Sequence, residues 1–445
     1  MKHIQKTGGT AVLPFLVFVL TFLGAGSYLN DFYALPSPVT VVLGIISAFF
    51  ILRGSTEAKV AALIRGCGDS KIITMCLIYL LAGAFATVTK AVGGVDATVN
   101  LGLSVVPVQY LGLGVFLLAA FLSTATGTSV GAIVALGPIV VGLAEQSHTS
   151  MPLLLGTLLG GAMFGDNLSF ISDTTIAATQ TQECSMRDKF RVNILIAGPA
   201  AAFTILLLLF AGQSASEAQA LARLSASYSL WQILPYLLVI VLAVSGVNVF
   251  VVLTLGTLAS GALGLWGGKL ELLSFGRSVY DGFTGMTEIF LLSMLTGGLA
   301  QMVSEAGGIR FLLEKISKTT RGYRSAQLGI GALVGGTNTA IANNTVSIVV
   351  TGEVVKEISE AHSVDKRKTA ALIDIFACLV QGLLPYGAQL LILLSFTNGS
   401  LSFLDLWPYA WYLYLLLFFS LLAIYTPYVD RYLAKQPAAE AALAV

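Results

Sequence analysis

The stretch from Gly160 to Gln180, GGAMFGDNLSFISDTTIAATQ, constrains this chain more than any other. It lies inside an apolar segment that begins near Pro152 and is long enough to cross a membrane as one helix. The segment nevertheless holds Asp166 and Asp173, and a carboxylate at membrane depth costs at least about 2.5 kcal/mol. Irregular backbone at that depth is tolerated only around a cavity, so the stretch predicts an unwound helix that lines an ion site. The alternative is a helix that ends early, with its polar end in water.

The composition is that of a polytopic membrane protein. The 445 residues are 56% hydrophobic and 11% charged, and the mean hydropathy is +0.86. A net charge of +1 gives no indication of a nucleic-acid partner, and four cysteines without paired spacing predict neither disulfides nor a metal cluster. The sequence shows no phosphate-binding glycine motif and no nucleophile–base pattern. We therefore expect no enzyme activity and no cofactor.

The apolar runs of spanning length form two sets of five. The first set lies at about 11–28, 37–52, 72–90, 152–180 and 193–213, and the second at about 230–247, 248–266, 286–306, 368–395 and 404–426.

Each set also contains a pair of apolar half-helices between its third and fourth runs, at about 106–146 and 325–360. Small polar residues interrupt the first pair at 123–129 and the second at both 337–339 and 343–345. We expect both pairs to be re-entrant hairpins, with two ordinary helices and a polar turn as the alternative.

The two sets match each other. Gly83-Ala84 corresponds to Gly297-Gly298, and Thr128-Ser129 corresponds to Asn343-Asn344 one residue later in register. The second register places Asp166 opposite Gln381. Five crossings plus a non-crossing hairpin make an odd number, so the second repeat has to be inverted in the membrane. The expected organisation is a first repeat at 1–213, a linker at 214–229, an inverted repeat at 230–435 and a cytoplasmic tail at 436–445.

Basic residues predict the orientation. With the N-terminus in the cytoplasm, the inside segments hold 20 of the 24 Lys and Arg, as the positive-inside rule requires. We expect an all-α, multi-pass protein of the cell (inner) membrane, with ten spans, two hairpins and both termini cytoplasmic. The first hairpin would open from the outside and the second from the inside.

Four polar elements meet near the membrane midplane in this arrangement, namely the two hairpin tips and the breaks at 165–175 and 381–389. Helix N-termini at the tips favour anions, whereas carbonyl, hydroxyl and carboxylate oxygens favour a hard cation such as Na⁺. Asp166 is the first candidate for an exchange carboxylate because its repeat partner, Gln381, is neutral. Removal from water favours the protonated form of a carboxylate, so the same group could exchange H⁺ for Na⁺.

Asp173 is the second candidate and Asp374 the third. For Asp374 the alternative is an acid near the surface, paired with Lys366 or Arg367. The candidate ion- and substrate-binding residues are the polar side chains of the four elements: Thr126, Thr128, Ser129, Asp166, Asn167, Ser169, Ser172, Asp173, Thr174, Thr175, Asn338, Asn343, Asn344, Thr345, Asp374, Gln381 and Gln389. Of these, Asp166 and Asp173 are the candidate Na⁺ ligands.

The sequence FGDNLSFISDTTIAA at 164–178 resembles the signature of the NhaC family of Na⁺/H⁺ antiporters, in the ion transporter superfamily, which typically reads GDKLSPLSDTT. The similarity in organisation covers nearly the whole chain. Two positions differ, because Asn167 stands in place of the usual lysine and Phe170 in place of the usual proline. The change at Asn167 removes a countercharge beside Asp166, so coupling and substrate could differ from the family pattern.

The resemblance implies a secondary transporter. The preferred function is Na⁺/H⁺ antiport with Asp166 and Asp173 as the exchange carboxylates, assisted by Ser169, Thr174 and Thr175. The alternative is a Na⁺- or H⁺-coupled transporter or exchanger of a small organic acid or amino acid, whose carboxylate the hairpin tips would hold. A channel or a membrane enzyme is a third possibility with less support. Expected partners are Na⁺, H⁺ and the lipid bilayer, without nucleic acid. Stoichiometry and oligomeric state, including a homodimer, stay open.

Overall fold

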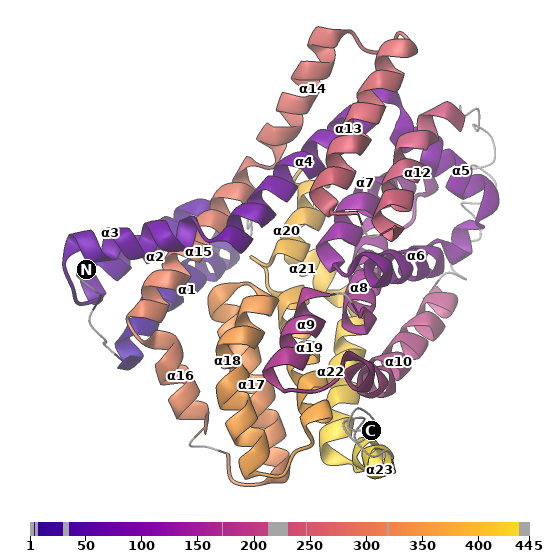
Figure 1. Cartoon of the computed structure of the whole chain (residues 1–445). Coiled ribbons are helices and arrows are strands. Elements are labelled where there is room, and N and C mark those ends of the chain that lie inside the picture. The colour runs from indigo at the N-terminus through magenta and orange to yellow at the C-terminus, as the bar shows by residue number, and fades with distance from the viewer. Residues whose placement is uncertain are drawn as a thin grey trace, which may run out of the picture.

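The computed structural model describes residues 4, 8–29, 35–170, 172–211, 230–245, 247–317 and 320–435, and within these ranges it is helical without strands (Figure 1). The expected linker at 214–229 and tail at 436–445 lie outside the described residues. The first half comprises η1 (Gly8–Val12), α1 (Leu13–Leu29), α2 (Ser37–Ile51), α3 (Thr56–Cys67), α4 (Ser70–Val92), α5 (Gly94–Val105), η2 (Val108–Tyr110), α6 (Leu111–Thr126), α7 (Ser129–Ser147), α8 (Met151–Leu168), α9 (Asp173–Thr181) and α10 (Met186–Ala211).

The helices of the second half follow in a similar order. They are α12 (Leu230–Val244), α13 (Val249–Trp266), α14 (Leu272–Gly285), α15 (Thr287–Glu305), α16 (Gly308–Ser317), α17 (Tyr323–Ile341), α18 (Asn344–Ala361), α19 (Lys366–Leu383), α20 (Ala388–Ser395), α21 (Phe403–Leu406), η4 (Trp407–Tyr409), α22 (Trp411–Tyr425) and α23 (Tyr428–Ala434). Five short helices lie outside the predicted apolar runs, namely α3, α5, α14, α16 and α23.

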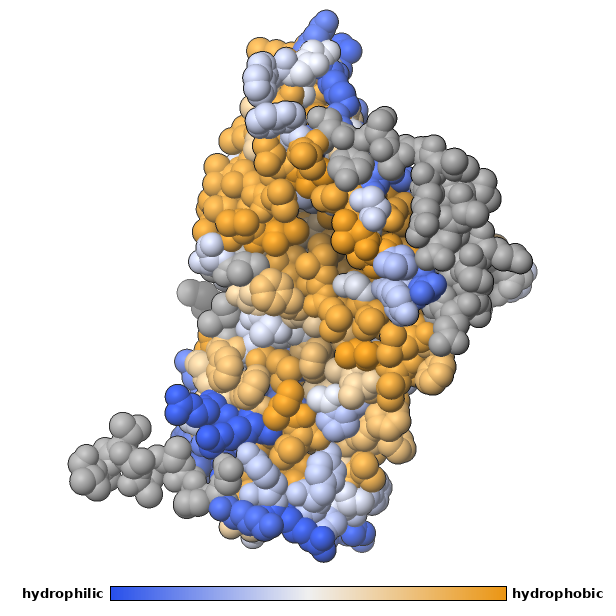
Figure 2. Space-filling view, turned by 90° about the vertical axis from the view of Figure 1, so that its right-hand side faces the viewer, coloured by the Kyte–Doolittle hydropathy of each residue, from blue (hydrophilic) through white to orange (hydrophobic). Residues whose placement is uncertain are grey.

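The described helices are those of a multi-pass membrane protein. Seven are long and apolar enough to span a membrane, and the number rises to ten if each of three bent helix pairs is one span. Large apolar side chains such as Phe50 and Phe210 are exposed on the outer helices, where a bilayer covers such surface. Figure 2 shows hydrophobic surface across the middle of one face and hydrophilic residues towards its two ends.

Both predicted hairpin segments form pairs of helices, α6/α7 and α17/α18, with the same local structure at the tip. The first helix of each pair ends at a left-handed residue, Gly127 (φ 71°) or Ala342 (φ 54°). The next side chain caps the second helix: Thr128 Oγ1 accepts from the Gly131 amide at 3.4 Å, and Asn343 Oδ1 accepts from the Val346 amide at 3.0 Å. That the pairs are re-entrant stays a prediction.

The expected interruption at 337–339 is wrong, because α17 continues to Ile341. The polar side chains there have partners that leave the helix intact. Asn338 Nδ2 donates to the Ala377 carbonyl of α19 at 2.8 Å, and Thr339 Oγ1 donates to the Gly335 carbonyl at 2.9 Å. Similarly, α6 stays helical through Thr126, so the first pair is interrupted only at residues 127–128.

Both broken helices are present, but the breaks are shorter than expected. α8 ends at Leu168 and α9 begins at Asp173, while α19 ends at Leu383 and α20 begins at Ala388. Asp166 and Gln381 therefore lie in the last helical turn before each break and not in unwound chain. In Figure 1, α8 lies near the middle of the molecule, and α9 and α19 lie beside α18 in its lower half.

Candidate functional site

Asp166 is enclosed where the first hairpin tip meets the first break. Its side chain lies at the end of α8, and the residue is only 4% exposed. Ser129 Oγ donates to Asp166 Oδ2 at 2.8 Å, and the Ser129 amide donates to the same oxygen at 3.4 Å. Ser172 Oγ donates to Asp166 Oδ1. The carboxylate thus faces the N-terminus of α7, whose free amides and dipole favour negative charge.

A chain of hydrogen bonds continues from Asp166 into the second half. Ser129 Oγ accepts from Gln389 Nε2 at 3.1 Å, and Gln389 Oε1 accepts from Gln381 Nε2 at 3.1 Å. Gln381 Nε2 also donates to the Ala342 carbonyl at the second hairpin tip, at 3.2 Å. The Gln381 Oε1 atom is buried and has no hydrogen-bond partner within the described residues. The structure therefore brings both hairpin tips and both broken helices to one polar centre.

A buried ion pair lies beside this centre. Lys189 Nζ of α10 is 2.7 Å from Asp374 Oδ2 of α19, with side chains 1% and 0% exposed. Lys189 Nζ also donates to the Asn167 carbonyl at 3.0 Å and to Thr175 Oγ1 at 2.6 Å. Asn193 Nδ2 donates to the same Asn167 carbonyl at 2.7 Å and to Asp374 Oδ2 at 3.0 Å. Lys189 thereby ties α8, α9 and α19 together across the first break.

The interpretation of Asp374 as a surface acid is wrong. Its cationic partner is Lys189, not Lys366 or Arg367, and Arg367 NH2 pairs with Asp365 Oδ2 at 2.6 Å. Asp374 is fully buried, and its helix, α19, packs against α10 and α17. A lone charge there would be very costly, so the pair stabilises the fold only as long as both members are present.

The remaining polar residues of the motif form hydrogen bonds around the break between α8 and α9. Ser169 Oγ donates to the Thr124 carbonyl at 2.9 Å, and Thr175 Oγ1 donates to the Ser169 carbonyl at 2.8 Å. Thr174 Oγ1 and Ser172 Oγ share a hydrogen bond of 2.9 Å. Asn167 Nδ2 donates to the buried Tyr412 hydroxyl at 3.2 Å. These bonds join the end of α8 and the start of α9 to each other and to α6 and α22.

The other candidates do not bond to the Asp166 carboxylate within the described residues. Asp173 is the first residue of α9 and is exposed, so it is not enclosed with Asp166. Asn338 bonds to a backbone carbonyl of α19, and Asn344 Nδ2 has only a long contact of 3.9 Å to Cys378 Sγ. The half-buried residues at the two tips are Thr126, Thr128, Asn343, Asn344 and Thr345.

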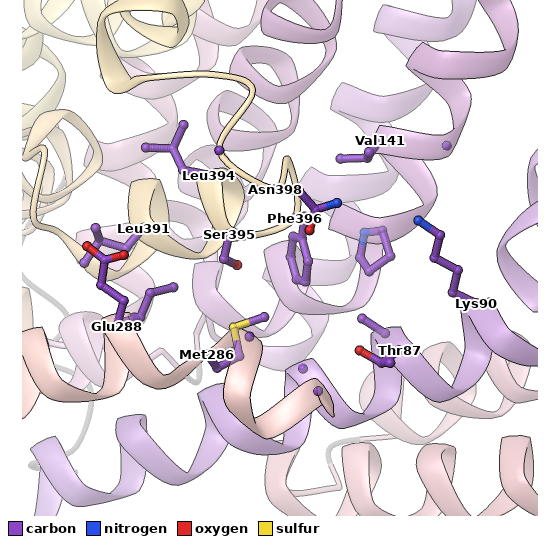
Figure 3. Close-up of a pocket in the computed structure, with 18 of the residues that line it drawn as sticks. Thr87, Lys90, Val141, Met286, Glu288, Leu391, Leu394, Ser395, Phe396 and Asn398 are labelled. Carbon is purple, nitrogen blue, oxygen red and sulfur yellow. The ribbon is translucent and has the colours of Figure 1, made fainter. Parts of the chain in front are cut away.

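A cavity of about 450 Å³ approaches the centre from one side. Its walls come from α4, α7, α15 and α20, and it reaches Pro385 in the second break. Figure 3 shows Glu288 and Lys90 on opposite sides of this cavity, with Leu394 and Ser395 of α20 between them. The cavity shares α7 and α20 with the Asp166 centre, although Asp166 itself does not line it.

Sequence reasoning missed Lys189, Asn193 and Tyr412. Lys189 was counted as a basic residue of a cytoplasmic loop because the fifth apolar run begins only at 193. The signal that could have found it is helical spacing, because Lys189 and Asn193 fall on the same stripe as the buried Ile196 and Ala200. Two polar residues on an apolar helical stripe predict a buried contact.

Buried carboxylates held between two broken helices in a multi-pass membrane protein define a secondary transporter. The sequence model of the Na⁺/H⁺ antiporter family matches this chain over residues 3–213 and 213–428. The chain therefore belongs to the Na⁺/H⁺ antiporter family, as the motif at 164–178 indicated.

Curated relatives carry several substrates. The chain is 25% identical to the Na⁺/H⁺ antiporter NhaC of Bacillus subtilis, over 78% of this chain and 82% of that protein. It is 24% identical to the malate-2H⁺/Na⁺-lactate antiporter of the same organism, over 72% and 74%. It is 23% identical to the arginine/ornithine antiporter ArcD of Halobacterium salinarum, over 85% and 84%. Among solved structures, the Alcanivorax borkumensis YdaH transporter matches with a TM-score of 0.38 and 11% identity, over 94% of this chain and 97% of that one.

Proposed function

We propose that this protein exchanges Na⁺ for H⁺ across the cell membrane and that Asp166 is the residue at which the two ions compete. The observation that carries the proposal is the setting of Asp166. Its carboxylate is buried and hydrogen-bonded by two hydroxyls and one amide, and the ion pairs of the described residues do not include it. A buried carboxylate without a fixed countercharge requires a mobile cation, which is either H⁺ or a metal ion.

The surrounding oxygens suit Na⁺. Ser129 and Ser172 supply hydroxyl oxygens next to the carboxylate, and hard cations take oxygen ligands of this kind. The amide oxygens of Gln389 and Gln381 lie further along the same hydrogen-bonded chain. Protonated Asp166 has lost the charge that attracts Na⁺, so each ion excludes the other. Exchange follows if the protein changes its accessible side only with one of the two ions bound. Asp173, being exposed, would act as an auxiliary ligand on the access path.

Transport by the purified protein in proteoliposomes tests the proposal. A proton gradient is imposed, and Na⁺, Li⁺ or K⁺ is then added while the internal pH is followed. We expect Na⁺ to dissipate the gradient and K⁺ to leave it unchanged. A gradient that responds to none of these ions, but collapses when a dicarboxylate or an amino acid is added with Na⁺, would replace the proposal with the coupled organic carrier.

One observation favours that second candidate. A cavity of about 450 Å³ is far larger than a hydrated ion needs, and it falls in the size range of small-molecule sites. Its wall carries Lys90, which could receive a carboxylate, together with Asp96, Glu145 and Glu288, which could receive an amine. In this reading Asp166 would bind the coupling ion and the cavity would bind the organic substrate.

Ser129 should contribute directly to ion binding, because its hydroxyl joins Asp166 to Gln389. We expect Ser129→Ala to lower apparent Na⁺ affinity roughly 10- to 100-fold, the value of a hydrogen bond to a charged group. Ser123→Ala is the matched control, because Ser123 Oγ donates to the Ala162 carbonyl at 2.6 Å and does not bond to Asp166. Isothermal calorimetry measures both. Equal affinities in the two variants would remove Ser129 from the ion site.

We also propose that the two halves are inverted repeats, with the end formed by the α20–α21 connection outside and the α18–α19 connection inside. A cysteine at Ser400 should then react with an impermeant maleimide added to intact cells, and one at Glu360 should react only after the membrane is opened. Both positions are exposed in the structure. Reaction of both from the same side would contradict the arrangement. Native cysteines, of which Cys76 and Cys378 are buried, are replaced by serine in the background.

A further inference from the structure

The buried ion pair determines how many charges the transport site can exchange. Beside Asp166 lie two further buried charges, Asp374 and Lys189, and the three form one region because Asn167, next to Asp166, bonds to Lys189. We propose that Lys189 stays a fixed ammonium group throughout transport, so that the site has a constant charge of −1 and exchanges one H⁺ for one Na⁺ without net charge movement. This inference rests on the Na⁺/H⁺ exchange proposed above.

The hydrogen bonds around Lys189 specify its protonation state. The Asn167 carbonyl and the Asp374 carboxylate can only accept. Thr175 Oγ1 uses its own hydrogen for the Ser169 carbonyl, so it too has to accept from Lys189. Three acceptors at 2.6–3.0 Å require three N–H donors, and only the ammonium form has three. A neutral amine would leave one buried acceptor unsatisfied beside a charged Asp374.

The other groups near the Lys189–Asp374 pair do not change the net charge of the region. Cys378 Sγ lies 3.9 Å from Asp374 Oδ1, and Tyr412 bonds to Asn167; a thiol and a phenol are neutral at ordinary pH. Asp188, one residue before Lys189, is compensated by Arg191 at 3.6 Å and by Ser185. Asp173 is exposed to its surroundings and is not part of the buried set.

The fixed charges therefore sum to −1, from two carboxylates and one ammonium. One bound H⁺ or one bound Na⁺ makes the region neutral, whereas the region without either ion carries a buried charge that is costly to move through the membrane. Only the two neutral forms are then suited to change sides. The same argument excludes a cycle in which Lys189 releases a second proton, because that would leave one of its three buried acceptors without a donor.

Equilibrium gradients in proteoliposomes measure the exchange ratio. With the membrane potential held at zero by K⁺ and valinomycin, one pH unit should balance about a tenfold Na⁺ gradient for one-to-one exchange and about a hundredfold gradient for two protons per Na⁺. We expect tenfold. If one net charge moved per cycle, imposing about 100 mV would shift the balance roughly 50-fold, and we expect no shift.

The double variant Lys189→Met/Asp374→Asn tests the role of the pair itself. It removes one charge of each sign, keeps the sum at −1 and leaves neither member of the pair as an unpaired charge. Whatever its rate, its exchange should remain one-to-one and insensitive to voltage. A hundredfold balance or a voltage response in the wild type would overturn the inference while leaving Na⁺/H⁺ exchange intact. The absence of any Na⁺-dependent proton movement would instead overturn the proposed function, and the charge inference with it.

Discussion

Asp166→Asn should abolish Na⁺/H⁺ exchange and lower Na⁺ affinity by about two orders of magnitude or more, because removing one member of a desolvated charge pair costs about 2–5 kcal/mol. The variant should still fold. Asparagine keeps an oxygen that can accept from Ser129, and its amide nitrogen can donate to Ser172 Oγ, which can in turn donate to Thr174 Oγ1. The matching position of the second half, Gln381, already carries an amide.

The pH dependence has a definite sign. In the wild type a proton on Asp166 excludes Na⁺, so apparent Na⁺ affinity should fall as pH is lowered, by up to about tenfold per unit once the carboxylate is mostly protonated. Asp166→Asn should lose this dependence together with the binding. Calorimetric titrations of Na⁺ between about pH 5.5 and 8.5 measure both properties.

Asp173→Asn is the matched control for Asp166→Asn. It makes the same chemical change in the same motif, but at an exposed position. We expect weaker binding at most, with the pH dependence retained. If Asp173→Asn removed the pH dependence and Asp166→Asn did not, the roles assigned to the two aspartates would have to be exchanged.

Lys189→Met should be the most destabilising single substitution in the centre. Methionine fills a similar volume, but it leaves Asp374 as an unpaired buried carboxylate, and breaking a buried pair in this way costs about 3–5 kcal/mol. The apparent melting temperature in detergent should fall markedly. The double variant Lys189→Met/Asp374→Asn should recover much of the loss, because position 374 then carries no unpaired charge.

An exposed pair of the same length provides the control for Lys189→Met. Lys356 Nζ lies 2.7 Å from Glu183 Oε1, as Lys189 does from Asp374, but both partners are in contact with solvent. Lys356→Met should therefore leave the melting temperature nearly unchanged. Equal effects at Lys356 and Lys189 would show that burial does not govern the Lys189–Asp374 pair.

Repetition in the sequence predicted the centre better than any single motif. The register that pairs Asp166 with Gln381 also pairs Ser129 with Asn344 and Thr174 with Gln389, and the structure brings Asp166, Ser129, Gln381 and Gln389 into one hydrogen-bonded chain. Apolar runs located both breaks to within a few residues. They could not give the length of each break, because a polar side chain can stay in a helix by donating to a carbonyl of the preceding turn, as Thr339 does to Gly335. Composition does not show such hydrogen bonds.

Orientation of individual side chains was beyond the sequence. Asp173 stands in the same motif as Asp166, yet Asp166 lies in the last turn of α8, whereas Asp173 begins α9 and is exposed. The acidic residue next to Lys189 in the sequence, Asp188, is not its partner, because Asp188 pairs with Arg191 and Asp374 is 185 positions away in the other half. Lys189 is thus the countercharge of Asp374 and not of Asp166, and only three-dimensional packing identifies it.

The Lys189–Asp374 pair and the Ser129–Gln389 hydrogen bond have a mechanical consequence. The ion pair joins α10 of the first half to α19 of the second, and the hydrogen bond joins α7 to α20. Both interactions are buried, so breaking them costs much free energy. We expect these helices to move together as one rigid body during transport. This rigid body would then move relative to α4 and α15. The boundary between the two parts would lie at the cavity, where packing between α7 and α20 on one side and α4 and α15 on the other is already interrupted.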